Sequence, residues 1–184
     1  MFDALFTTTT EYKKLSHALS GKGACALFGL PASGRAQVYA ALCRQLDKPL
    51  CIVTPGEAEA TRFAADLNTL GIPTAVFPAR DYVLRPIEGT AREYEYRRLA
   101  VLGELVGGRL RAVAVPAEAL TQFTTPKEDF CANTRTLHAG DTLLRDDLLA
   151  ALFGAGYTRR AQVDGPGQFS VRGDIVDIFA PDQK

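Results

Sequence analysis

The chain has 184 residues, of which 47% are hydrophobic and 23% are charged, as in an ordinary soluble globular protein. Lysine plus arginine and aspartate plus glutamate number 21 each, so the formal net charge is zero. Domains that bind a phosphate backbone are usually basic, so this balance disfavours a simple DNA-binding domain.

The cysteines and histidines show no pattern of a metal site or a disulfide framework. The four cysteines, at positions 25, 43, 51 and 131, include no CxxC pair, and the two histidines are far apart in the sequence. The first residues lack the basic and apolar segments of a signal peptide, and no apolar run reaches the length of a membrane span. We therefore expect a cytoplasmic protein with reduced cysteines, no metal and no membrane partner.

Short apolar runs alternate with helical patterns over the first two thirds of the chain. The runs resemble buried parallel strands and lie at residues 24–28, 50–54, 74–77 and 111–115. The helical patterns place apolar residues on shared faces: Val38 with Leu42 and Leu46, Phe63 with Leu67 and Leu70, and Leu99 with Leu102 and Val106. This alternation predicts an α/β domain with a mostly parallel sheet over residues 1–122.

A polar stretch at residues 124–129, which contains a helix-stopping proline, marks a change in composition. The sequence after it predicts a strand at 134–138, a helix at 145–153, and two strands at 168–172 and 174–179 that turn at Gly173. Residues 123–184 are therefore expected to form a small α+β domain. Because a hairpin and one helix bury little surface, we expect this domain to continue beyond residue 184.

The turn after the first predicted strand has the glycine spacing of a P-loop, GxxxxGK[ST], with Gly29 and Gly34 in place. Arg35 stands where the P-loop lysine reaches the β- and γ-phosphates, and Ala36 stands where a hydroxyl holds Mg²⁺. Pro31 also removes one backbone N–H. We expect a degenerate loop that binds no nucleotide cofactor. A phosphate or sulfate ion at the helix N-terminus, or a plain strand-to-helix turn, remains open.

The most specific motif is GQFSVRGDIVDIFAP at residues 167–181. It resembles the "GxFxVRGDxxDIFP" stretch shared by the excision-repair protein UvrB and by transcription-repair coupling factors. In both families this stretch follows a RecA-like domain whose P-loop corresponds to residues 29–36, so the resemblance spans nearly the whole chain. It implies a degenerate RecA-like domain followed by a small domain that resembles a truncated second domain of UvrB.

Two departures distinguish the two families. UvrB keeps the lysine and threonine of its P-loop, whereas this chain has Arg35 and Ala36. UvrB also carries a Tyr-rich β-hairpin that clamps damaged DNA. Here residues 77–82 run directly into the helix expected around residues 92–105, which leaves no room for that hairpin. Both departures favour the N-terminal module of a coupling factor, and the alternative is UvrB itself or another P-loop ATPase.

The resemblance to coupling factors implies a protein-interaction module that hydrolyses no ATP and has no catalytic residues. Such a module presents its small domain to UvrA and so recruits excision repair to RNA polymerase stalled at DNA damage. RNA polymerase and double-stranded DNA are partners of other domains in these proteins. ATP and magnesium serve the translocase motor, which lies outside this chain.

In these families an arginine of the VRGD stretch contributes to the UvrA contact, and it matches Arg172. Arg159 and Arg160, in the preceding strand, have a spacing that would place them near Arg172 on the same sheet face. All three are expected to bind the partner. The alternative is that Arg172 is a turn residue, or an ion-pair partner of Asp174 or Asp177.

Arginines, acids and tyrosines mix over residues 80–98. Such a belt could bind nucleic acid through arginine and aromatic stacking. A solvated helix face with pairs such as Glu93 and Arg97 explains it better.

Overall fold

The computed structural model describes residues 6–21, 23–46, 48–80 and 91–181. Contacts divide the chain into two compact units. The first consists of Met1–Ala79 and Gly107–Gln122, and the second of Arg80–Val106 and Phe123–Lys184. The first unit ends at Gln122, and the second resumes at Phe123. Residues 80–106, however, group with the second unit and not with the first.

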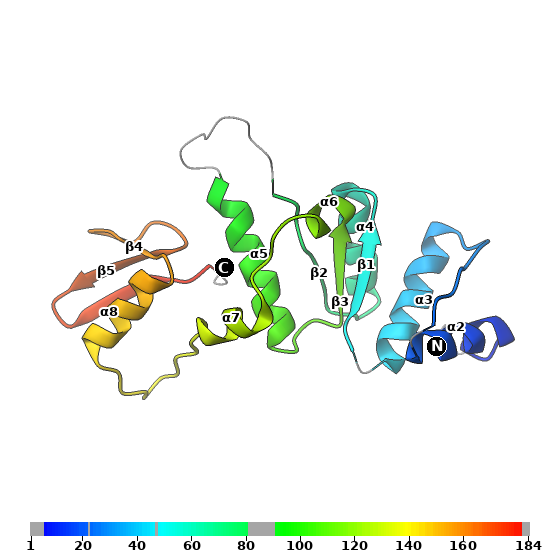
Figure 1. Ribbon diagram of the computed structural model, residues 1–184, viewed down its shortest axis with the longest axis horizontal. Helices are drawn as coiled ribbons and strands as arrows, with labels where there is room; N and C mark the ends of the chain where they lie inside the picture. The colour runs from blue at the N-terminus through cyan, green and yellow to red at the C-terminus, as the bar shows by residue number, and fades with distance from the viewer. Residues whose placement is uncertain (1–5, 22, 47, 81–90, 182–184) are drawn as a thin grey trace. The chain divides into compact units, whose positions relative to one another are not determined.

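Three parallel strands form the sheet of the first unit: β1 (Leu50–Thr54), β2 (Thr74–Val76) and β3 (Ala112–Pro116) (Figure 1). β3 lies between the other two, and Ile52 of β1 and Val76 of β2 both pair with Ala114. Every residue of β3 is buried, as is typical of a central strand in a parallel sheet. The expected mixed α/β fold with a small parallel sheet is confirmed.

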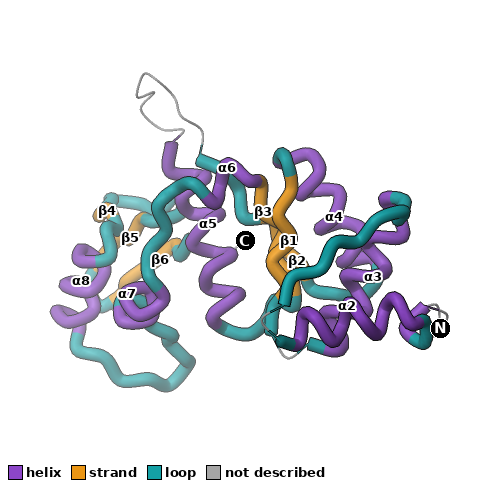
Figure 2. Tube along the Cα trace, turned by 45° about the vertical axis from the view of Figure 1, so that its right-hand side comes forward, coloured by secondary structure: helices purple, strands orange, loops and turns teal. Residues whose placement is uncertain are grey.

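Helices cover one side of this sheet (Figure 2). α4 (Glu57–Thr69) packs on all three strands, and α3 (Ala32–Gln45) packs against α4 and β1. α2 (Thr10–Ser20) lies on α3, where Tyr12 and Leu15 contact the buried Val38 and Leu42. The short helix α6 (Ala117–Leu120) follows β3 directly. The apolar stripes expected on α3 and α4 therefore face the core.

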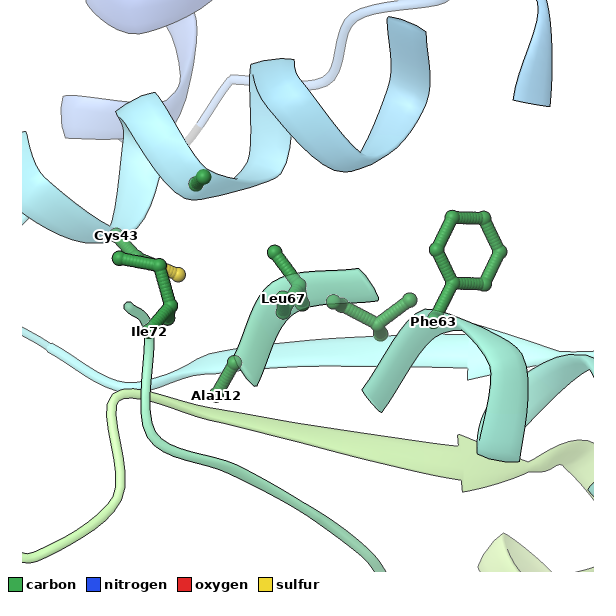
Figure 3. Close-up of a cluster of buried hydrophobic side chains, with 7 residues drawn as sticks. Cys43, Phe63, Leu67, Ile72 and Ala112 are labelled. Carbon is green, nitrogen blue, oxygen red and sulfur yellow. The ribbon is translucent and has the colours of Figure 1, made fainter. Parts of the chain in front are cut away.

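The main core of the first unit lies between α3, α4 and the strands (Figure 3). Leu67 of α4 is fully buried at its centre. Around it lie Cys43 of α3, Ile52 of β1 and Ala112 of β3. Phe63, one turn before Leu67, meets Tyr39 in a tilted ring contact with the ring centroids 5.6 Å apart. The buried apolar surface of this cluster holds the two helices on the sheet.

The described residues of the second unit form three helices and a small sheet. The helices are α5 (Ala91–Val106), α7 (Lys127–Ala132) and α8 (Arg145–Gly154). The strands are β4 (Thr158–Arg159), β5 (Gln168–Arg172) and β6 (Ile175–Phe179). β4 runs parallel to β5, and β5 and β6 form an antiparallel hairpin. The helix at 145–153 and the two strands around Gly173 are thus confirmed.

Aromatic and polar contacts hold the second unit together. Phe153 of α8 meets the fully buried Phe169 of β5 edge-to-face, with ring centroids 5.1 Å apart. The guanidinium of Arg98, which is buried in α5, donates to the hydroxyl of Thr124 at 2.8 Å. The phenol of Tyr96 occupies the space beside Gly167, where a side chain would not fit. These contacts explain why α5 groups with the residues after 122.

Two predicted strands do not form. Residues 24–28 lie exposed outside the sheet, and the side chain of Phe28 is 88% exposed. β1 and β2 each have one unpaired edge in the sheet order β1-β3-β2, but residues 24–28 pair with neither of them. Residues 134–138 are also irregular and exposed, because they follow α7 without a described neighbouring strand to pair with.

The prediction of an apolar stripe on α5 is also wrong. Leu99 and Val106 are exposed, whereas Val101 and Arg98 are buried. The hydrogen bonds that Arg98 makes to residues 123 and 124 satisfy its guanidinium, so the helix can turn this charged residue inward.

Candidate functional site

A helix begins between Gly29 and Gly34, within the segment that has the glycine spacing of a P-loop. α3 begins at Ala32, directly after Pro31, and the amide of Arg35 donates to the carbonyl of Pro31 at 3.1 Å. Gly34 and Arg35 therefore belong to the first helical turn. A P-loop instead keeps the residues between its glycines in an open loop whose N–H groups surround the phosphates. Ala36 is buried and Arg35 is exposed.

Arg172 is the last residue of β5 and lies at the tip of the β5–β6 hairpin. It pairs in register with Ile175, so only Gly173 and Asp174 form the turn. Gly173 has a φ of +59°, which matches a type II′ turn, where glycine takes the first central position. The tight turn fixes both strand ends and presents Arg172 at the surface.

The guanidinium of Arg172 forms an ion pair with Asp177 across the hairpin. Its Nη2 donates to Oδ2 of Asp177 at 2.6 Å, and the hydroxyl of Ser170 donates to the same oxygen at 3.1 Å. These two hydrogen bonds, first that from Arg172, hold the pKa of the Asp177 carboxyl below its usual value. The side chain of Arg172 nevertheless stays 68% exposed. The ion pair predicted as an alternative is therefore present, with Asp177 as the partner.

Strand alternation decides which residues share the face of Arg172. Gln168, Ser170 and Arg172 point to one face of β5, and Phe169 and Val171 point to the other, where Phe169 meets α8. On β6, the partners of Ser170 and Arg172 are Asp177 and Ile175. Ile175 is 61% exposed, so an apolar side chain borders Arg172.

Two arginines lie at the end of β4. Arg159 pairs with Phe169 in the parallel ladder and so lies on the side opposite to Arg172. Arg160 follows the end of β4, and its amide donates to the carbonyl of Phe169 at 2.8 Å, so its backbone continues the pairing with β5. Both arginines are exposed. Sequence reasoning missed Ile175, although counting outward from the turn at Gly173 would have paired it with Arg172.

Some of the arginines, acids and tyrosines in residues 80–98 contact one another. Arg80 forms an ion pair with Glu95, and the guanidinium of Arg97 lies over the ring of Tyr94, 5.8 Å from its centroid. Asp81, Tyr82 and Arg85 lie outside the described residues. Among the residues that the structure does describe, no group of three or more His, Cys, Asp or Glu side chains could hold a metal ion. None of the described helices has both the length and the apolarity of a membrane crossing.

The hairpin that carries Arg172 matches a known domain class. Residues 136–184, which include α8 and all three strands of the second unit, match the family model of the UvrB interaction domain. The C-terminal quarter of the chain is thus similar to this domain family.

The chain is also similar to individual proteins over most of its length. It is 29% identical over 155 residues to the transcription-repair-coupling factor of Bacillus subtilis (strain 168), a match that covers 83% of this chain. It is 27% identical over 153 residues to that of Staphylococcus aureus (strain USA300) and 36% identical over 159 residues to that of Mycobacterium bovis, each over 82% of this chain. The chain is related to transcription-repair-coupling factors, as its sequence indicated, and it spans 13% of the length of these relatives.

Proposed function

We propose that the chain is the UvrA-docking module of a transcription-repair coupling factor, and that it recruits excision repair to RNA polymerase stalled at DNA damage. The observation that carries this proposal is the position of Arg172. It is an exposed arginine at a tight hairpin turn, within the segment that matches the UvrB interaction domain. The fixed turn presents this cation in a defined place, as a docking contact requires.

The chemistry of the hairpin face fits a protein partner. A guanidinium carries five N–H donors, and the ion pair with Asp177 involves Nη2. The remaining N–H groups, which include the second one on Nη2, can form a bidentate contact with a carboxylate of UvrA. The exposed Ile175 beside Arg172 adds apolar area, and interfaces combine such apolar contacts with arginine anchors. Arg160 lies directly beside this sheet and adds a further exposed cation, whereas Arg159 lies on the side opposite to Arg172.

The first unit, in this proposal, is a degenerate RecA-like domain that hydrolyses no ATP. The early start of α3, together with Arg35 and Ala36, supports this reading. The contacts with RNA polymerase and double-stranded DNA, and the ATP- and magnesium-dependent translocase, belong to other parts of a longer cytoplasmic protein. The division into domains at residue 122 is part of the same proposal.

Three titrations separate this function from its competitors. Purified UvrA should bind the chain saturably in isothermal titration calorimetry, and ATP with Mg²⁺ should not. DNA should bind feebly and with a strong dependence on salt, because the chain has no net charge. Saturable ATP binding without UvrA binding would favour a P-loop ATPase. Tight, lesion-selective DNA binding in a gel-shift assay would instead favour UvrB.

A further inference from the structure

We infer that Asp177 is a positioning residue for docking: it holds the guanidinium of Arg172 in the orientation that meets the carboxylate of the partner. This inference rests on the proposed function and deepens it. An exposed arginine is long and samples many rotamers, so binding normally has to restrict it. A side chain that is already held by its own domain loses less freedom when the partner arrives.

Two hydrogen bonds to Asp177 connect the buried Ser170 with the exposed Arg172. Ser170 is 1% exposed, so its hydroxyl is fixed within β5. It donates to Oδ2 of Asp177, and the same oxygen accepts from Nη2 of Arg172. All three residues lie on one face, because Ser170 pairs with Asp177 and Arg172 follows Ser170 by two positions. The buried serine thus fixes the position of the carboxylate, and the carboxylate fixes the orientation of the guanidinium.

Asp177 could instead compete with the partner for Arg172, and the geometry argues against that. The contact with Asp177 is made by one terminal nitrogen, Nη2. A guanidinium has two edges that can bind a carboxylate in a bidentate manner, and both include Nη2. Because Nη2 carries two N–H groups, its hydrogen bond to Asp177 can occupy one edge and leave the other for a partner carboxylate. Asp177 therefore leaves room for a partner carboxylate while it restrains the plane of the guanidinium.

The neighbouring Asp174 provides a matched control. It lies in the same hairpin and its removal changes the net charge equally, but within the described part of the chain it forms no ion pair with Arg172. An effect of charge alone would appear equally in Asp174→Ala and Asp177→Ala. An effect of positioning would appear only in the second variant.

The test is a set of UvrA affinities, measured by calorimetry on the whole chain, with the melting temperature recorded for each variant. Asp177→Ala should weaken UvrA binding about three- to tenfold, the range expected when one long side chain must be ordered on binding. Asp177→Asn should lie between Asp177→Ala and the unchanged protein, because its amide oxygen still accepts both hydrogen bonds. Asp174→Ala should stay within about twofold.

The double variant Arg172→Ala with Asp177→Ala distinguishes positioning from a general loss of structure. If Asp177 acts through Arg172, removing Asp177 should change nothing further once Arg172 is gone. The inference would be overturned if Asp177→Ala lowered the UvrA affinity equally with Arg172 present and with Arg172 replaced by alanine. Tighter UvrA binding by Asp177→Ala would also overturn it. If Asp177→Ala lowers the melting temperature markedly, the same UvrA affinities are compared for Asp177→Asn, alone and together with Arg172→Ala. Unchanged affinity of a folded Arg172→Ala would instead refute the proposed function itself.

Discussion

Replacing Gly167 by alanine should destabilise the second unit for two separable reasons. Gly167 has a φ of +72°, a conformation that costs an L-residue roughly 1–2 kcal/mol. The added methyl would also run into the phenol of Tyr96. Moving the tip of this partly exposed side chain costs about 0.5–1.5 kcal/mol, as for a side chain forced off its rotamer. The sum is a loss of about 1.5–3.5 kcal/mol in the free energy of unfolding.

Gly173→Ala is the matched control for the backbone contribution. Gly173 has a φ of +59°, and nothing lies within 4 Å of an added Cβ. It should therefore show only the backbone cost of about 1–2 kcal/mol. The effect of alanine on the unfolded chain is the same in both variants and cancels in the comparison. Urea unfolding followed by circular dichroism measures both losses.

The excess loss of Gly167→Ala over Gly173→Ala should disappear in a Tyr96→Ala background, because the clash is then gone. Equal losses for the two glycines, or an excess that survives the removal of Tyr96, would refute the packing of α5 against the hairpin.

Three further predictions address the core, the hairpin and the loop. Leu67→Ala, at the fully buried centre of the first unit, should lower the free energy of unfolding by about 2–5 kcal/mol. Leu120→Ala, at an exposed position, should change it by less than about 0.5 kcal/mol in the same urea titration. The pKa of Asp177 is lowered by folding, so its contribution to stability is present above the unfolded value of 3.8 and is lost as pH falls through the lower folded value. Asp177→Asn should accordingly lose less stability on acidification below that pH than Asp174→Asn, and identical acid profiles would contradict the ion pair. The double change Arg35→Lys with Ala36→Ser should still give no saturable ATP–Mg²⁺ binding in calorimetry, because α3 begins at Ala32 and closes the loop. Micromolar affinity would show that the loop can open.

Sequence patterns predicted the elements that depend on local signals. The hairpin of β5 and β6 was found because alternation and the glycine at 173 specify a turn within a few residues. α8 was found from its apolar spacing and its terminal glycine. Residues 24–28 have an equally apolar pattern and form no strand, although β1 and β2 each have an unpaired edge. An apolar run does not by itself decide whether the chain pairs with the edge of a sheet.

The misjudged features all depend on contacts between distant residues. The inward turn of α5 depends on Arg98 reaching Thr124, and a polarity pattern treats any arginine as solvent-facing. The grouping of residues 80–106 with the second unit depends on Tyr96 meeting Gly167. In the candidate site, Arg172 was identified through its motif, whereas the pairing with Asp177 was one alternative among others. The placement of Arg159 on the side opposite to Arg172 required the register of β4 and β5.

The affinity of UvrA for Arg172→Ala tests the central claim most directly, with Arg159→Ala, on the opposite side of the sheet, as its control. Truncating an arginine anchor costs about 2 kcal/mol of binding free energy, or roughly thirtyfold in affinity. An exposed ion pair contributes little to folding, so the melting temperature should stay within a few degrees. Arg172→Lys should also weaken binding, because an ammonium cannot reproduce the planar guanidinium. A folded Arg172→Ala protein that binds UvrA as tightly as the unchanged chain would contradict the account.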